Sequence, residues 1–297
     1  MSRIILITMG FICALLAAAG IMWYSYNNLD NSVHNKKSSI PKGLKTKTEI
    51  KYKFIEKSGD YQKVLESKNI RRYDNRGNQI EFDEYDADGK LTSKYLTLYN
   101  AQGKEIEFTG YDADGKLKGR DSPWYDDRGN LVEWDEYDAE GKLTGKVMYK
   151  YDNRGNEIEH LSYDADGKLS FKWFYRYDKR GNKIEWADYD ADGQLQYRWL
   201  DRYDENGKNI EYARYGSDGK LIKKYCPIYD DKGNQIECHG YDSDGRLRKK
   251  SFHKYDDKGN RIEEINYDIK EESGQAKETP TFLIIYEYEF YPKANNK

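Results

Sequence analysis

The sequence predicts an all-β protein, an antiparallel β-meander repeat array of about sixteen strands that follows one N-terminal hydrophobic helix. Three features of the 297-residue chain predict it. Tyrosine recurs at regular spacing, a glycine follows at the fourth position after it, and the segments between these signals have the length and residue types of β-strands. A 26-residue unit is present about seven and a half times.

The repeat is defined by its tyrosines, whose spacing follows a 12/14 alternation without an exception. Aspartate follows the tyrosine everywhere except at Asn100 and Gly216, and glycine stands four places after it everywhere except after the last tyrosine. A fixed period of this length is typical of a repeat architecture. The tyrosines are Tyr73, Tyr85, Tyr99, Tyr111, Tyr125, Tyr137, Tyr151, Tyr163, Tyr177, Tyr189, Tyr203, Tyr215, Tyr229, Tyr241, Tyr255 and Tyr267.

Two kinds of turn alternate within the unit, one like Tyr73–Asn78 (YDNRGN) and one like Tyr85–Lys90 (YDADGK). The aspartate can accept a hydrogen bond from the backbone two positions on, and the glycine suits the positive φ of a type I turn closed by a G1 bulge. Connections this short require successive strands to pair antiparallel.

The segments outside the array are expected to cap it. Ile50–Ile55, a turn at Lys57–Asp60 and the following strand form an N-terminal hairpin, and the apolar stretch Thr281–Tyr291 covers the C-terminal edge. Because neighbouring strands twist by about 20–25°, the array is expected to coil into a superhelical sheet or open shell. The predicted divisions are a signal anchor or signal peptide (1–26), a polar linker (27–48), the cap hairpin (49–72), the repeat domain (73–270) and a capping strand with tail (271–297).

The N-terminal segment predicts export. Residues 4–23 carry no charge, and Tyr24 and Tyr26 follow them, as in a helix that spans a bilayer. Ala17–Ala19 equally suits the cleavage site of a signal peptide, so both interpretations stay open. The protein is therefore expected to be anchored in the cell envelope, on the periplasmic or cell-surface side, or to be secreted if the leader is cleaved.

Turn geometry also predicts a strand register. If the aspartate of a turn pairs with the residue after the glycine, Cys226 lies opposite Cys238. Opposed Cβ atoms are about 4.5–5.5 Å apart, so a disulfide is expected in an exported protein; two free thiols are the alternative. The same register places Lys94 opposite Phe82 and Lys146 opposite Trp134. One side of the sheet is therefore expected to carry cations over aromatic rings. The other side is expected to carry the repeat tyrosines and the glutamates equivalent to Glu81. Neither side is wholly apolar, which argues against a lipid-facing barrel.

Composition and motifs narrow the classes of function. The net charge of -3 and the interspersed signs give no basic surface for nucleic acid. The four histidines occupy unrelated repeat positions and are expected as isolated surface residues, and no catalytic triad, phosphate-binding loop or Cys/His metal spacing is present. Asp86–Gly89 resembles half of a calcium loop but lacks its remaining acidic ligands. We therefore predict no metal, no cofactor and no catalytic residues, and we do not expect an enzyme.

A binding surface is the better candidate. Tyr95, Trp173, Trp199 and Tyr225 occupy the same place in their strands, on the tyrosine side. Equivalent strands two steps apart lie about 9.5 Å from each other, so these rings would form an aromatic stripe. Such a stripe suits a polysaccharide or an envelope or surface protein; the alternative is that the rings only pack against the tyrosine rows.

The alternating Tyr-Asp-x-x-Gly motifs over about residues 71–270 resemble the YD-repeat, or Rhs-like, family of bacterial surface and secreted proteins. The resemblance implies β-sheet shells or spirals that encapsulate toxin domains or mediate cell-surface contact, and it suggests carbohydrate binding. The strict 12/14 alternation is more regular than the family pattern, and neither an effector domain nor an Asp-Pro self-cleavage core is recognisable. Repeat architecture rather than toxin delivery is what the resemblance implies.

The sequence as a whole predicts a non-catalytic structural or binding repeat protein that is displayed at the cell envelope and binds glycan or protein through the aromatic stripe. The alternative is an envelope hydrolase or an accessory component of an Rhs-like secreted system.

Overall fold

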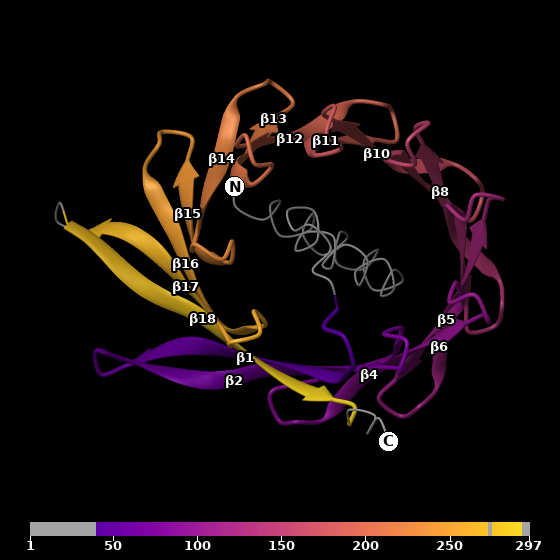
Figure 1. Cartoon of the computed structure of the whole chain (residues 1–297), viewed down its shortest axis with the longest axis horizontal. Helices are drawn as coiled ribbons and strands as arrows, with labels where there is room; N and C mark the ends of the chain where they lie inside the picture. Colours follow the sequence, from indigo (N-terminus) through magenta and orange to yellow (C-terminus); the bar gives the residue numbers. More distant parts are fainter. Residues whose placement is uncertain (1–39, 273–274, 293–297) are drawn as a thin grey trace, which may run out of the picture. The chain divides into compact units, whose positions relative to one another are not determined.

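The computed structural model describes residues 40–272 and 275–292, in which eighteen antiparallel strands form one sheet. Each strand pairs with the next along the chain and β1 pairs with β18, so the sheet closes into a barrel (Figure 1). The predicted antiparallel meander is confirmed. The predicted N-terminal helix lies outside the described residues. Within the described ranges, no helix is long and apolar enough to cross a membrane.

The strands follow one another in chain order. They are β1 (Leu44–Lys57), β2 (Asp60–Tyr73), β3 (Gln79–Tyr85), β4 (Leu91–Tyr99), β5 (Glu105–Asp112), β6 (Leu117–Tyr125), β7 (Leu131–Asp138), β8 (Leu143–Tyr151), β9 (Glu157–Asp164), β10 (Leu169–Tyr177), β11 (Lys183–Asp190), β12 (Leu195–Tyr203), β13 (Asn209–Gly216), β14 (Leu221–Tyr229), β15 (Gln235–Asp242), β16 (Leu247–Tyr255), β17 (Arg261–Glu272) and β18 (Gln275–Phe290).

The expected open superhelical sheet is wrong, because the strands outside the repeats close the barrel. β1 and β18 are long strands, whereas β3–β16 are short ones set by the repeat. The antiparallel pairing of β1 with β18 runs from Leu44 opposite Phe290 to Lys53 opposite Phe282. Closure pairs the backbone N–H and C=O groups that two free edges would leave open. The long hairpins β1–β2 and β17–β18 extend beyond the other strands (Figure 1).

The predicted turns are confirmed. In the turn after Tyr85, the N–H of Asp86 donates to the carbonyl oxygen of Lys90 over 3.0 Å, and that of Gly89 donates to Asp86 over 3.1 Å. The side chain of Asp86 accepts hydrogen bonds from the backbone of Asp88 and Lys90. Gly89 has a φ of 76°, which an L-residue rarely adopts.

The register differs from the prediction by one position. Tyr229 pairs with Gln235 but Ile228 pairs with Glu237, so each turn is followed by a second bulge that inserts an extra residue into the strand. Cys226 therefore lies opposite His239, and Cys238 opposite Pro227. Since neighbouring residues of a strand point to opposite faces, the two thiols lie on different faces, and both are free. The predicted disulfide is therefore not present in this structure.

The same shift overturns the predicted cation–aromatic pairs. Lys94 lies opposite Asp83, and Phe82 lies opposite Tyr95. Lys146 likewise lies opposite Asp135. The cations thus share a face with the glutamates, and the rings of neighbouring strands share the other face.

We call these the ion-pair face and the aromatic face. The aromatic face carries a ring at one equivalent position of every strand from β3 to β14 except β6 and β8: Phe82, Tyr95, Phe108, Trp134, His160, Trp173, Trp186, Trp199, Tyr212 and Tyr225. The ion-pair face carries Glu81, Glu107, Glu133, Glu159, Glu185, Glu211, Glu237 and Glu263.

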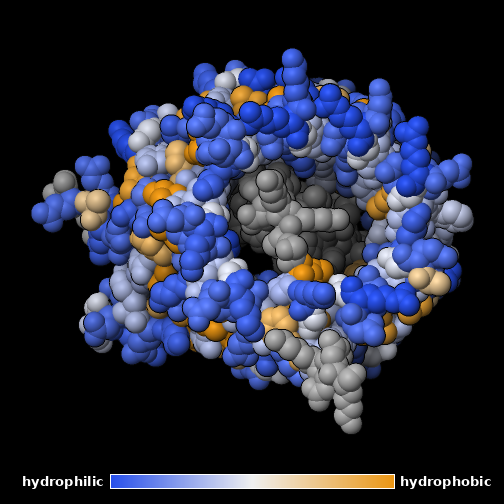
Figure 2. All heavy atoms as spheres, viewed as in Figure 1, coloured by the Kyte–Doolittle hydropathy of each residue, from blue (hydrophilic) through white to orange (hydrophobic). Residues whose placement is uncertain are grey.

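The aromatic face is the more buried of the two. Phe82 is 2% exposed and Tyr95 4% exposed, whereas lysines of the ion-pair face such as Lys94 keep about a third of the side chain in solvent. Side chains converge on the concave side of a closed barrel, so we assign the aromatic face to the inside and the ion-pair face to the outside. The end of the barrel seen in Figure 2 is mainly hydrophilic.

Candidate functional site

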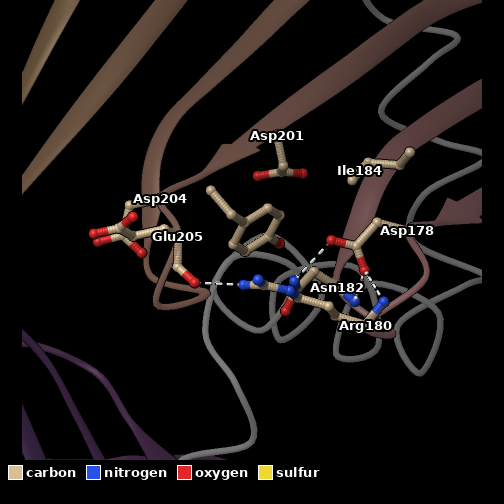
Figure 3. Close-up of a pocket in the computed structure, with 8 residues that line it drawn as sticks. Asp178, Arg180, Asn182, Ile184, Asp201, Asp204 and Glu205 are labelled. Carbon is tan, nitrogen blue, oxygen red and sulfur yellow. Dashed lines mark hydrogen bonds between the residues drawn. The ribbon is translucent and has the colours of Figure 1, made fainter.

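Two equivalent clefts lie at one rim of the barrel, where the turns that follow the even-numbered strands meet. The first has a volume of about 370 Å³ and is formed by the turn Asp178–Asn182, by Ile184 of β11, and by residues 201–205 (Figure 3). The second has a volume of about 360 Å³ and lies one repeat unit earlier, with Asp152, Arg154, Asn156 and Ile158 at the corresponding positions. The sequence repeat thus builds a repeated cleft.

The aspartate of each cleft is fixed by its own turn. Asp178 Oδ1 accepts hydrogen bonds from the backbone N–H groups of Arg180 (2.8 Å) and Asn182 (2.9 Å), and Oδ2 accepts one from Asn182 Nδ2 (2.8 Å). The hydrogen bond from the Asn182 side chain lowers the pKa of Asp178. This carboxylate is therefore ionised at neutral pH and is a poor general acid.

In three turns of this rim, an arginine connects the turn to the next one along the rim. Arg180 donates to the backbone oxygen of Glu205, Arg154 to that of Lys179 (3.2 Å), and Arg76 to that of Ala101 (3.2 Å). Figure 3 shows the end of the Arg180 side chain pointing toward Glu205, with Asp201 and Ile184 above it in this view. The guanidinium groups hold the turns in place, and they keep N–H donors at the cleft wall.

The floor of the first cleft comes from the aromatic face. Tyr203 OH donates to the carbonyl oxygen of Lys183 (2.8 Å), and burial raises the pKa of Tyr203 to about 12, so the phenol stays neutral. Asp201 Oδ1 accepts a hydrogen bond from Asn209 Nδ2 (2.7 Å). The cleft therefore offers guanidinium and amide donors, carboxylate acceptors and one aliphatic side chain, a set that suits a ligand rich in hydroxyl groups. In the described part of the chain, no group of three or more His, Cys, Asp or Glu could hold a metal ion.

The four predicted binding residues all lie on the aromatic face, and none of them lines either cleft. Tyr95 stacks on Phe82 (5.8 Å between centroids) and on Phe108 (5.5 Å). Trp173 and Trp199 lie on either side of Trp186, each 6.2 Å from it, and Tyr225 lies 4.9 Å from Tyr212. Tyr95, Trp173 and Trp199 are buried. Their contacts are with rings that the predicted register had placed on the other face.

The sequence did not predict the clefts or the burial of two histidines. The clefts could have been found from the arginine that recurs two positions after the aspartate, as in Arg76, Arg154 and Arg180. His160 and His253 are each 8% exposed, so the expectation of surface histidines is wrong for both. His160 fills a place in the aromatic row, 4.5 Å from Trp173.

A buried carboxyl group interrupts the aromatic row between Phe108 and Trp134. Asp121 is fully buried, lies directly opposite Glu136, and has no hydrogen bond of normal geometry to either carboxyl oxygen within the described residues. Burial, together with the Glu136 charge, raises the pKa of Asp121 to about 8, and the nearby Trp134 side chain opposes this only in part. Burial also raises the pKa of Glu105 to about 7. Glu105, Asp121 and Glu136 lie on β5–β7, in a different sector of the barrel from the clefts.

No protein-family model matches the chain, and no curated protein matches its sequence. Among solved structures, a porin-like protein from Bacteroides uniformis is similar over 82% of this chain and 97% of its own, with 10% identity and a TM-score of 0.47. The complex TcdB2–TccC3 is similar over 78% of this chain, which spans 16% of that one, with 14% identity and a TM-score of 0.24. A protein of unknown function from Bacteroides fragilis is similar over 53% of this chain and 98% of its own, with 15% identity and a TM-score of 0.24. These likenesses assign no function.

Proposed function

We propose that the chain is a non-catalytic binding protein, displayed outside the cytoplasm at the cell envelope, whose rim clefts bind a polysaccharide. The observation that carries the proposal is the recurrence, in successive repeat units, of a cleft lined by the same turn Asp, Arg and Asn side chains and by an equivalent tyrosine. Equivalent clefts are two strands apart, about 9.5 Å, so a regular polymer can place successive units in successive clefts. Several weak contacts along one chain then combine into a usable affinity.

The chemistry of the clefts supports binding rather than turnover. Hydrolysis of a glycosidic bond requires a protonated carboxyl group beside a second carboxylate. In each cleft the turn aspartate has a lowered pKa and is already occupied by its own turn. The aromatic rows beneath, including Trp173 and Trp199, stiffen the inner wall from which the cleft floors project. Export rests on the apolar N-terminal segment of the sequence.

The proposal can be tested by affinity electrophoresis of the purified full chain through gels that contain neutral or acidic polysaccharides. We expect retardation by at least one of them, with no increase in reducing ends. The double variant Arg154→Ala and Arg180→Ala should weaken the retention at least tenfold, because it removes a donor from both clefts. The matched control is Arg246→Ala, an exposed arginine in a turn at the opposite rim, which should bind like the unaltered protein. Retention that survives the double variant, or polysaccharide breakdown by the unaltered protein, would contradict the proposal.

A further inference from the structure

The ion-pair face has a regular pattern with three exceptions, Leu98, Trp124 and Ile228, of which the first two lie in successive repeats. The residue before every second repeat tyrosine lies directly opposite a glutamate of the row. At five positions it is Lys or Arg and pairs with that glutamate: Arg72 with Glu81 (2.6 Å), Lys150 with Glu159 (2.6 Å), Arg176 with Glu185 (2.8 Å), Arg202 with Glu211 (3.3 Å) and Lys254 with Glu263 (2.6 Å). The glutamates of this row thus pair with lysine or arginine side chains.

In two successive repeats the cation is replaced by an apolar side chain. Leu98 lies opposite Glu107 and is 52% exposed, and Trp124 lies opposite Glu133 and is 58% exposed. Met148, opposite Glu133 on its other side, is 38% exposed. These three side chains lie on alternate strands of the outer face, β4, β6 and β8, with Glu107 and Glu133 on the strands between them, and we call this group the apolar patch.

Glu107 stands inside this patch without a counter-charge. Glu133 still has Lys146 at 2.6 Å, but the residue equivalent to Lys146 beside Glu107 is Arg120, whose guanidinium lies over the ring of Tyr137 (5.5 Å) instead. Within the described ranges 40–272 and 275–292, six glutamates of the row pair with Lys or Arg and Glu237 contacts His239, which is charged only if protonated, whereas Glu107 has no basic side chain in ion-pair contact. Its carboxylate is thus available to a cation from outside the barrel.

We propose that Leu98, Glu107, Trp124 and Met148 form a docking surface for a protein segment that presents a lysine or arginine between apolar side chains. The partner would supply, from another molecule, the cation that the chain supplies to the other glutamates. Charge selects this occupant. A second copy docked through the same patch would bring Glu107 against Glu107, and like charges that face each other cost energy. The indole of Trp124 is held for contact by its hydrogen bond to Asp135 Oδ2 (3.1 Å).

The test uses the full chain and two synthetic peptides, Ac-Gly-Leu-Arg-Leu-Arg-Leu-Gly-amide and its counterpart with glutamate in place of arginine, with affinity measured by calorimetry. We expect the basic peptide to bind at least tenfold more tightly than the acidic one, and more weakly as salt is added. Leu98→Arg should reduce the affinity for the basic peptide at least tenfold while the melting temperature is unchanged or higher, because this variant restores the ion pair of the other repeats. Glu107→Gln should also weaken binding, and it leaves the apolar contacts intact.

The matched control is Ile228→Arg, the same change at the equivalent position of β14, which should leave peptide binding unaltered. Equal binding of the two peptides, or full binding by Leu98→Arg, overturns the proposal. A dimer of the unaltered chain that Leu98→Arg dissociates overturns it as well, because the occupant would then be a second copy.

Discussion

At the scale of single residues, Asp121 makes the stability of the barrel depend on pH, in a direction that follows from the shift of its pKa. Its pKa rises from 3.8 to about 8 in the folded chain because the carboxyl group is buried opposite Glu136. A carboxyl group whose pKa is raised by folding binds its proton more tightly in the folded state. Its contribution to stability is therefore complete below about pH 4 and is lost as the pH rises to about 8.

We predict that Asp121→Asn makes the protein more stable than the unaltered chain at alkaline pH. The amide cannot ionise, so the gain in the free energy of unfolding should be larger at pH 9 than at pH 5 by roughly 1–3 kcal/mol. Urea unfolding at the two pH values measures this difference. Asp178→Asn is the control of opposite sign, since the pKa of Asp178 is lowered and its contribution disappears only as the pH falls. An alkaline stability of Asp121→Asn no higher than that of the unaltered chain would show that Asp121 is not protonated in the fold.

Residue types alone indicated the special backbone positions but not the environments of single side chains. Asp86 and Gly89 were predicted in their turn roles because both act within a single turn. The pKa of Asp121 depends on Glu136, which lies beyond the next turn on another strand, and His160 is buried by rings of β8 and β10. Those neighbours become known only when the register is known.

In the strands and turns, the glycine of each turn is required for its backbone conformation. Gly193 has a φ of 76°, and a Cβ placed there would meet no atom within 4 Å. We predict that Gly193→Ala lowers the free energy of unfolding by about 1 kcal/mol, through the left-handed backbone conformation alone. Gly193→Asn should cost less, because asparagine tolerates this region.

Thermal or urea unfolding of these two variants tests the turn assignment. Gly240→Ala is a useful comparison, because its backbone is not left-handed but an added Cβ would lie 2.8 Å from Tyr225 Cε1. Its cost should come from displacement of the Tyr225 ring. If Gly193→Ala were as stable as the unaltered protein, the positive φ would be wrong.

The pairing of the glutamate row with lysine and arginine side chains depends on the register of the strands. The predicted register missed it because the second bulge after each turn moves every partner by one position, and a shift of one position exchanges the faces. The first bulge, within the turn, can be predicted from its glycine. The second bulge, at Gln235–Ile236 for example, has no glycine to mark it.

In the molecule as a whole, closure can be tested at the seam between β1 and β18. Ile50 lies directly opposite Ile285, and opposed residues have Cβ atoms about 4.5–5.5 Å apart. We predict that the double variant Ile50→Cys and Ile285→Cys forms a disulfide on mild oxidation, identified by mass spectrometry of the linked peptides. Ile50→Cys combined with Ile228→Cys on β14 should form none, because β14 is separated from β1 by β15–β18. An open sheet would leave both variants unlinked within one chain.

The meander, its 26-residue period, the turn geometry and the N-terminal hairpin could all be predicted from the amino-acid order, because each depends on contacts between residues close together in the chain. The register, the assignment of side chains to the two faces and the closure of the barrel became known only from the folded chain. Register depends on a bulge that no single residue type marks, and it moved Cys226 away from Cys238 and Lys94 away from Phe82. Closure joins the first strand, β1, to the last, β18, through the pairing of backbone groups that every strand carries whatever its sequence.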